Sequence, residues 1–132
     1  MRIISATVLA LALGFPISAS AASAASILGS WSGRGTIRLT TGQVEPVSCR
    51  VTYEKGDDKG KTFVLQANCA STAGTFVQTG RVVKRSSSSY SGRLYSDQYS
   101  VSGNVSISVS GARQTVRVSS PKGSGSLKLK RR

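Results

Sequence analysis

From Trp31 to the C-terminus, apolar and polar residues alternate along the chain with a period of two. Such alternation is typical of half-buried β-strands, whereas a helix repeats about every 3.6 residues, and no helical period of any length appears in this region. Short segments rich in glycine and in charged or polar residues separate the runs and indicate turns. The runs span residues 31–40, 47–53, 63–69, 74–85, 90–95, 99–109, 113–120 and 126–132.

About eight strands, each next to its neighbour in sequence, predict an all-β fold. Antiparallel strands in up-and-down order close naturally into a small barrel, which removes the exposed edges of an open sheet. A β-sandwich is the alternative. In the fourth run the apolar residues fall on both parities, and Gly80 marks a candidate bulge. The sixth run begins at Tyr99 and either curves at Gly103 or is divided by a turn at Gly103–Asn104.

The two cysteines support this arrangement of strands. Cys49 and Cys69 both fall on the apolar parity of their runs, and pairing them opposite each other centres the connecting turn on Lys59, within the charged loop between the runs. In an exported chain two cysteines most simply form a disulfide, and closing a loop of about 20 residues contributes roughly 3 kcal/mol in the chain-entropy model. Two thiols without any histidine are a poor zinc site, so we expect no bound metal.

The first residues have the composition of an export signal. A cationic start at Arg2 is followed by a short apolar stretch and then by small residues, with small-x-small cleavage points after Ala21 and Ala24. The apolar stretch is shorter than the about 20 residues that span a bilayer. We therefore expect residues 1–24 to be a signal peptide and residues 25–132 to form one domain without a transmembrane segment, located in the periplasm or secreted.

The G-x-W at Gly29–Trp31 resembles the start of the first strand in lipocalin and avidin-like barrels. That resemblance implies that the Trp31 indole plugs one end of the barrel, and that a cationic side chain from a late strand lies across it. Arg117 is the candidate by position, and such a contact is worth about 1 kcal/mol. In a β-sandwich, by contrast, Trp31 is an ordinary core residue.

A longer resemblance covers most of the mature chain. The segments "GSWSGRGTIRLTTGQVEPVSCRVTY", "ANCAS" and "YSGRLYSD" followed by "YSVSGNVSISVSG" are similar to a group of uncharacterised small exported bacterial proteins with W-S-G-x-G, C-R-V-x-Y and C-A-S signatures. The resemblance implies a periplasmic β-barrel and supplies no activity. The chain departs from that pattern at "RLYSD", where a second tryptophan is expected, and in its short C-terminal strands.

The residues expected of an enzyme are missing. The chain has no histidine, and its five acidic residues are scattered over loops and turns instead of forming a pair on one face. No G-x-S-x-G and no S-x-x-K sequence occurs. The acidic residues in "GDDKGK" lie among lysines and are better interpreted as a solvated turn than as a calcium loop. The sequence therefore predicts a protein that is not an enzyme and holds no cofactor.

Positive charge is the feature that suggests a function. Without residues 1–24 the net charge is one less than the +13 of the whole chain. The planar guanidinium group of arginine binds carboxylate and phosphate groups well, because it can hydrogen-bond to two oxygens of the same group. We expect an envelope-associated protein that binds lipopolysaccharide, acidic polysaccharide or phospholipid headgroups, with nucleic acid a poor candidate in that compartment. The C-terminal "KLKRR" is interpreted as a frayed cationic end. The candidate polyanion-binding residues, all on the polar parity of their strands, are Arg34, Arg38, Arg50, Arg93 and Arg117.

Two alternatives use other parts of the barrel. The chain is an inhibitor that binds a protein such as a protease through loops like "EKGDDKGK", or it carries a small apolar ligand in the barrel interior. A filled core is favoured over a hollow one, and a continuous cavity of about 300 Å³ or more would reverse that preference. The inward glycines 33, 35, 92 and 103 argue for a cavity at one end. The side chains expected to fill the core are Ile37, Leu39, Val51, Tyr53, Phe63, Leu65, Leu94, Val105, Ile107, Val109, Val116 and Val118.

Overall fold

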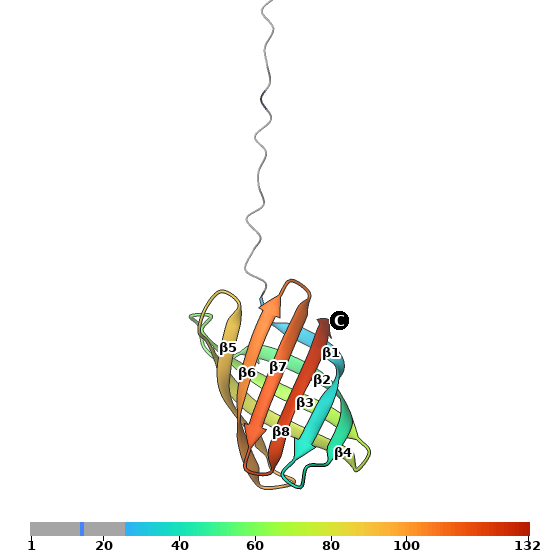
Figure 1. Cartoon of the computed structure of the whole chain (residues 1–132). Coiled ribbons are helices and arrows are strands. Elements are labelled where there is room, and N and C mark those ends of the chain that lie inside the picture. Colours follow the sequence, from blue (N-terminus) through green and yellow to red (C-terminus); the bar gives the residue numbers. More distant parts are fainter. Residues whose placement is uncertain (1–13, 15–25) are drawn as a thin grey trace, which may run out of the picture.

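The computed structural model describes residue 14 and residues 26–132 and shows a closed antiparallel barrel (Figure 1). Each strand is hydrogen-bonded to the next in sequence, and β1 closes the barrel against β8. The predicted up-and-down barrel is thus confirmed, and the sandwich alternative is wrong. The strands are β1 (Gly29–Leu39), β2 (Val44–Lys55), β3 (Thr62–Ser71), β4 (Gly74–Lys84), β5 (Ser89–Ser96), β6 (Val101–Ser110), β7 (Arg113–Ser120) and β8 (Gly123–Arg131).

The predicted signal peptide and its cleavage points lie outside the described residues, apart from Gly14. Among the residues that the structure describes, no helix has the length and hydropathy needed to cross a membrane.

The register of the strands settles the points that the sequence left open. β4 pairs with β3 without interruption from Thr75 to Val83, so no bulge occurs at Gly80. β6 is one continuous strand through Gly103, so the alternative of a turn there is wrong. The strand begins at Val101 rather than at Tyr99, which lies in the β5–β6 turn.

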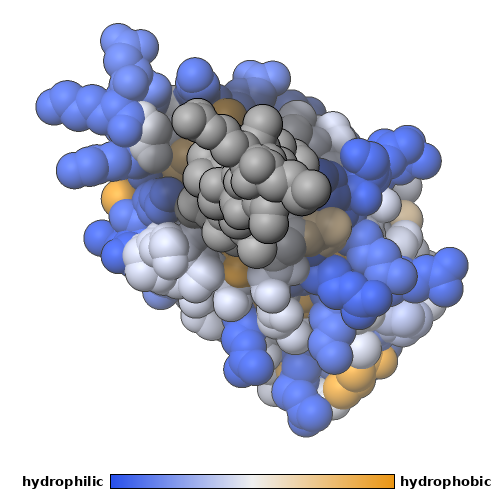
Figure 2. Space-filling view, turned by 90° about the horizontal axis from the view of Figure 1, so that it is seen from above, coloured by the Kyte–Doolittle hydropathy of each residue, from blue (hydrophilic) through white to orange (hydrophobic). Residues whose placement is uncertain are grey.

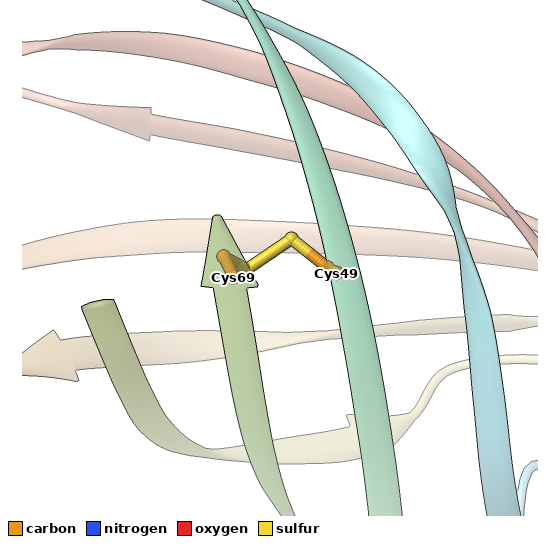
Figure 3. The surroundings of a disulfide bond; sticks show 2 residues. All are labelled: Cys49 and Cys69. Atoms are coloured by element: carbon orange, nitrogen blue, oxygen red, sulfur yellow. A yellow bond between two sulfur atoms is a disulfide. The ribbon is translucent and has the colours of Figure 1, made fainter. Parts of the chain in front are cut away.

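The disulfide forms as the strand pattern predicts. Cys49 on β2 and Cys69 on β3 are direct cross-strand partners, and their sulfurs are bonded (Figure 3). Both side chains are buried, and the bond ties together two strands joined by the loop of residues 56–61. Asp57 organises this loop, because its carboxylate accepts hydrogen bonds from the backbone N–H groups of Lys59 and Lys61, each at 3.1 Å.

Trp31 closes one end of the barrel. The indole is fully buried, and its Nε1–H donates a hydrogen bond of 2.9 Å to the backbone carbonyl of Ile27, itself fully buried. The guanidinium of Arg131 lies over the indole, 4.3 Å from the ring centroid. Arg131 also donates to the carbonyls of Leu28 and Ser26, and so fastens the segment before β1 to the end of β8.

The cation over Trp31 is therefore Arg131, and the expectation of Arg117 was wrong. Arg117 pairs with Ser106 and Ser126 on the outer surface, away from the indole. The C-terminal residues are not frayed, because β8 continues to Arg131 and is paired on both sides. Around this closed end the surface is mostly hydrophilic, with a few separate apolar patches (Figure 2).

The apolar core fills the half of the barrel that lies next to Trp31. Most of the predicted core residues are buried there, and Tyr53 donates a hydrogen bond of 2.7 Å to Gln114 Oε1. Burial raises the pKa of the Tyr53 phenol, so the group stays a neutral donor. Three predicted core residues, Ile37, Leu39 and Val118, are only half-buried. They lie toward the other end, where the barrel is hollow.

Candidate ligand cavity and cationic face

The end of the barrel opposite Trp31 contains a cavity of about 330 Å³. Its rim is formed by the β1–β2, β3–β4, β5–β6 and β7–β8 turns, so that Ala73, Tyr99 and Lys122 from three of these turns line the opening. The expectation of a filled core is therefore wrong for this half of the molecule. The apolar side chains that line the cavity are Ile37, Leu39, Val47, Phe76, Val101, Val118 and Leu127, together with the disulfide.

One buried polar atom faces this apolar space. The hydroxyl of Ser96, at the end of β5, is buried and has no hydrogen-bond partner, and the residue is only 3 % exposed. A buried hydroxyl without a partner is unusual and costs about 1–3 kcal/mol. Gln78 on β4 also lines the cavity, and Glu45 and Lys122 contribute charged groups to its lining. The lining thus combines a large apolar surface with a few polar groups.

The glycines that keep the cavity open differ from those that the sequence suggested. A β-carbon at Gly33 or Gly35 would overlap the backbone of β8, and one at Gly92 would overlap the backbone of β4. These positions allow strands to approach closely and create no empty space. Gly125 on β8 does line the cavity, and a β-carbon there would meet only ordinary contacts, the nearest being Thr36 O at 3.5 Å. Sequence alone does not distinguish these two kinds of inward glycine.

The outer surface carries a patch of positive charge on four adjacent strands, β2, β1, β8 and β7. We call this patch the cationic face. Its side chains are all exposed, and the strand register places them in neighbouring rows. Two pairs are direct cross-strand partners, Arg34 with Lys128 and Arg113 with Lys130. The residues of the face are Arg34, Arg38, Arg50, Arg113, Arg117, Lys128 and Lys130.

Four of the five predicted polyanion-binding residues belong to this face, but Arg93 does not. Arg93 lies on β5, at the opposite side of the barrel, where it pairs with Arg81 on β4. Its guanidinium donates hydrogen bonds to Asn104 Oδ1 at 2.8 Å and to Ser102 Oγ at 3.1 Å. Arg113 was not among the predicted residues, and Lys128 and Lys130 were not assigned to a site because the C-terminal run was interpreted as a frayed end.

Comparisons with known proteins support the fold and supply no identity. No protein family and no curated protein matches the chain. Among solved structures it is similar to a de novo designed fluorescence-activating β-barrel, with a TM-score of 0.64 and 18% identity over 83% of this chain and 98% of that one. A redesigned β-barrel gives 0.66 and 12% over 83% and 95%. The redesigned barrel mFAP0, bound to DFHBI, gives 0.64 and 13% over 79% and 97%.

Proposed function

We propose that this protein binds one small, mainly apolar molecule in the open end of its barrel. The cavity is the observation that carries the proposal. Its volume of about 330 Å³ lies at the lower end of the range of about 300–1,000 Å³ that is usual for ligand pockets. A barrel of eight strands has room either for a packed core or for one small ligand. Here the core occupies one half of the interior and leaves the other half open.

The lining indicates the chemistry of the ligand. Ile37, Phe76 and Leu127 present apolar surface to the cavity, and such surface is a poor environment for water. The unpartnered hydroxyl of Ser96 favours a molecule with one hydrogen-bonding group that reaches this atom. We therefore expect an aromatic or aliphatic molecule with a single polar group, entering between the turns at the open end. The proposed location is the periplasm or the outside of the cell, as the predicted signal peptide indicates.

Filling the cavity tests this function. The substitution Gly125→Leu adds a side chain at a position that lines the cavity and where a β-carbon makes only ordinary contacts. N-phenyl-1-naphthylamine, a neutral fluorescent molecule with one N–H group, is a suitable probe. We expect its fluorescence to rise on binding to the natural chain, and its affinity to fall about ten- to a hundredfold in Gly125→Leu because the added side chain overlaps the bound molecule.

Ser126→Leu is the matched control, since it adds the same side chain on the same strand but on the outer surface. The control is expected to bind the probe as the natural chain does. Circular dichroism checks that both variants are folded. If Gly125→Leu then binds the probe as tightly as the natural chain does, the probe does not occupy the cavity.

The substitution Ser96→Ala is expected to have opposite effects on stability and on binding. In the free protein it removes a buried hydroxyl that has no partner, so the free energy of unfolding should rise by about 1 kcal/mol. Binding of N-phenyl-1-naphthylamine should weaken roughly two- to tenfold, because its N–H loses an acceptor. Urea denaturation and fluorescence titration measure the two effects. Binding of 1-benzylnaphthalene, which lacks the N–H, should stay the same, and an equal loss for both molecules would exclude a hydrogen bond to Ser96.

A further inference from the structure

The cationic face brings like charges together. Arg34 lies directly opposite Lys128, and Arg113 lies directly opposite Lys130. Like charges in direct cross-strand pairs destabilise a sheet. β1, β7 and β8 carry no acidic residue that would compensate them, and Glu54, near the end of β2, is the nearest outward-facing carboxylate on the four strands. The arrangement therefore destabilises the sheet slightly, and an external anion that neutralises these pairs would remove that cost.

The cationic face is also bounded on both sides by strands without charge, although Arg81 and Arg93 form a separate basic pair on the opposite side of the barrel. β3 and β6, which flank the cationic face, carry no basic residue at all. Their outward positions hold neutral side chains such as Gln66, Asn68 and Asn104. Solubility alone does not require neutral strands beside a basic face, because the same positive charge spread over all strands repels other copies of the protein equally well. The borders therefore define a surface with a limited width of four strands.

The spacing of the charges favours an extended polymer over a single small anion. Neighbouring strands lie about 4.8 Å apart and outward residues on one strand about 6.6 Å apart, so basic residues that are cross-strand partners or two positions apart have backbones about 5–7 Å from each other. Arg113, Lys130, Lys128 and Arg34 form one continuous series of this kind. Each exposed group binds an anion weakly, but a linear chain of anionic groups engages several at once.

The remaining side chains of the face distinguish between possible polymers. Hydroxyl groups occupy the positions between the charges, and they hydrogen-bond well to sugar hydroxyls and carboxylates. The large exposed apolar residues of the described chain are Val44, Val64, Val77, Tyr95 and Tyr99, and of these only Val44 lies on the four strands. Apart from Val44 at the start of β2, the four strands therefore lack the aromatic and aliphatic anchors that surface helices insert into membranes. The hydroxyl residues are Ser32, Thr36, Ser48, Thr115, Ser124 and Ser126.

We infer that the cationic face binds an acidic polysaccharide. The carboxylates of the polymer lie against the arginine and lysine rows, and its hydroxyls contact the serine and threonine side chains between them. Since the face is on the outside of the barrel, this binding is independent of the ligand proposed for the cavity. The protein would thus be held on an anionic sugar polymer while its open end stays free to take up a small molecule.

Two double variants that remove equal charge test the inference. Arg34→Gln with Lys128→Gln removes one cross-strand pair from the cationic face, and Arg81→Gln with Arg93→Gln removes the corresponding pair from the opposite side of the barrel. Binding to immobilised polygalacturonate is measured at several salt concentrations. At about 50 mM salt we expect the first variant to lose roughly tenfold or more in affinity, and its log–log salt slope to become smaller by about 1.4. The second variant should bind as the natural chain does.

The two double variants also distinguish a polysaccharide site from attraction by total charge and from binding to a different polyanion. An equal loss in both would mean that the total charge attracts the polymer, and would overturn the inference. Binding to vesicles containing phosphatidylglycerol and to duplex DNA is measured at the same salt concentration. The inference would also be overturned if either of them binds more tightly than polygalacturonate and if that binding weakens in the variant of the cationic face. Gly125→Leu should bind polygalacturonate normally, so a failure of the cavity proposal leaves this result unchanged.

Discussion

Replacing Trp31 with alanine is expected to lower the free energy of unfolding by about 3–5 kcal/mol, the usual range for a large buried aromatic side chain. The indole is fully buried, and the substitution removes both its hydrogen bond to the Ile27 carbonyl and the surface on which Arg131 lies. The closed end of the barrel would then be open to water. Equilibrium denaturation in urea, followed by circular dichroism, measures the loss.

Two further substitutions divide this effect into its parts. Trp31→Phe keeps an aromatic ring but removes the N–H that donates to the Ile27 carbonyl. We therefore expect it to lower the free energy of unfolding by about a third to a half as much as Trp31→Ala does. Arg131→Gln removes the cation from the ring and should cost about 1 kcal/mol. A loss below about 1 kcal/mol in Trp31→Ala would show that the indole does not seal this end.

Removing the disulfide is expected to have the second largest effect. The double variant Cys49→Ala with Cys69→Ala should lose about 3 kcal/mol, because the bond closes a loop of 20 residues in the unfolded chain. The slope of the free energy against urea should increase, since the unfolded chain without a cross-link exposes more surface. The natural chain treated with a reductant is the control and should unfold at the same urea concentration as the variant. If the urea midpoint of unfolding is unchanged in both the double variant and the reduced natural chain, the disulfide does not stabilise the protein by restricting its unfolded state.

The fold was predictable because its signals are local. Alternation with a period of two identifies strands, and the equal parity of Cys49 and Cys69 sets the register of β2 and β3 without any knowledge of the rest of the barrel. The Trp31 plug was implied by the resemblance of Gly29–Trp31 to the start of lipocalin and avidin-like barrels, and the residue lies near the start of β1. The identity of its cation did not follow, since it depends on how far β8 extends, and the end of the chain was interpreted as frayed instead of as strand as far as Arg131.

The candidate sites were predictable only in part. The outward parity of Arg34, Arg38, Arg50 and Arg117 follows from the strand pattern, but their grouping depends on which strands are neighbours after the barrel closes. That closure also moves Arg93 to the opposite side. The resemblance to uncharacterised exported proteins and the hypothesis of a protein inhibitor stay predictions.

The cavity was the less favoured alternative for a different reason. Whether an interior is full depends on the sum of side-chain volumes against the space between strands, and small differences in that sum decide the outcome. Ile37 and Val118 are inward-facing as predicted, yet they line a space instead of filling it. The hydroxyl of Ser96 gave no signal in the sequence, because its lack of a partner appears only when its neighbours in space are known.

The close-approach glycines determine which shapes the barrel interior admits. Gly35 lies where β1 meets β8, and Gly80 and Gly92 lie where β4 meets β5, on the opposite side of the barrel. At both places the backbones approach too closely for any β-carbon, which allows the sheet to bend sharply there. Two sharp bends on opposite sides flatten the cross-section of a tube. We therefore expect a flattened opening and selection by thickness: planar molecules should enter the open end more readily than spherical ones of equal volume.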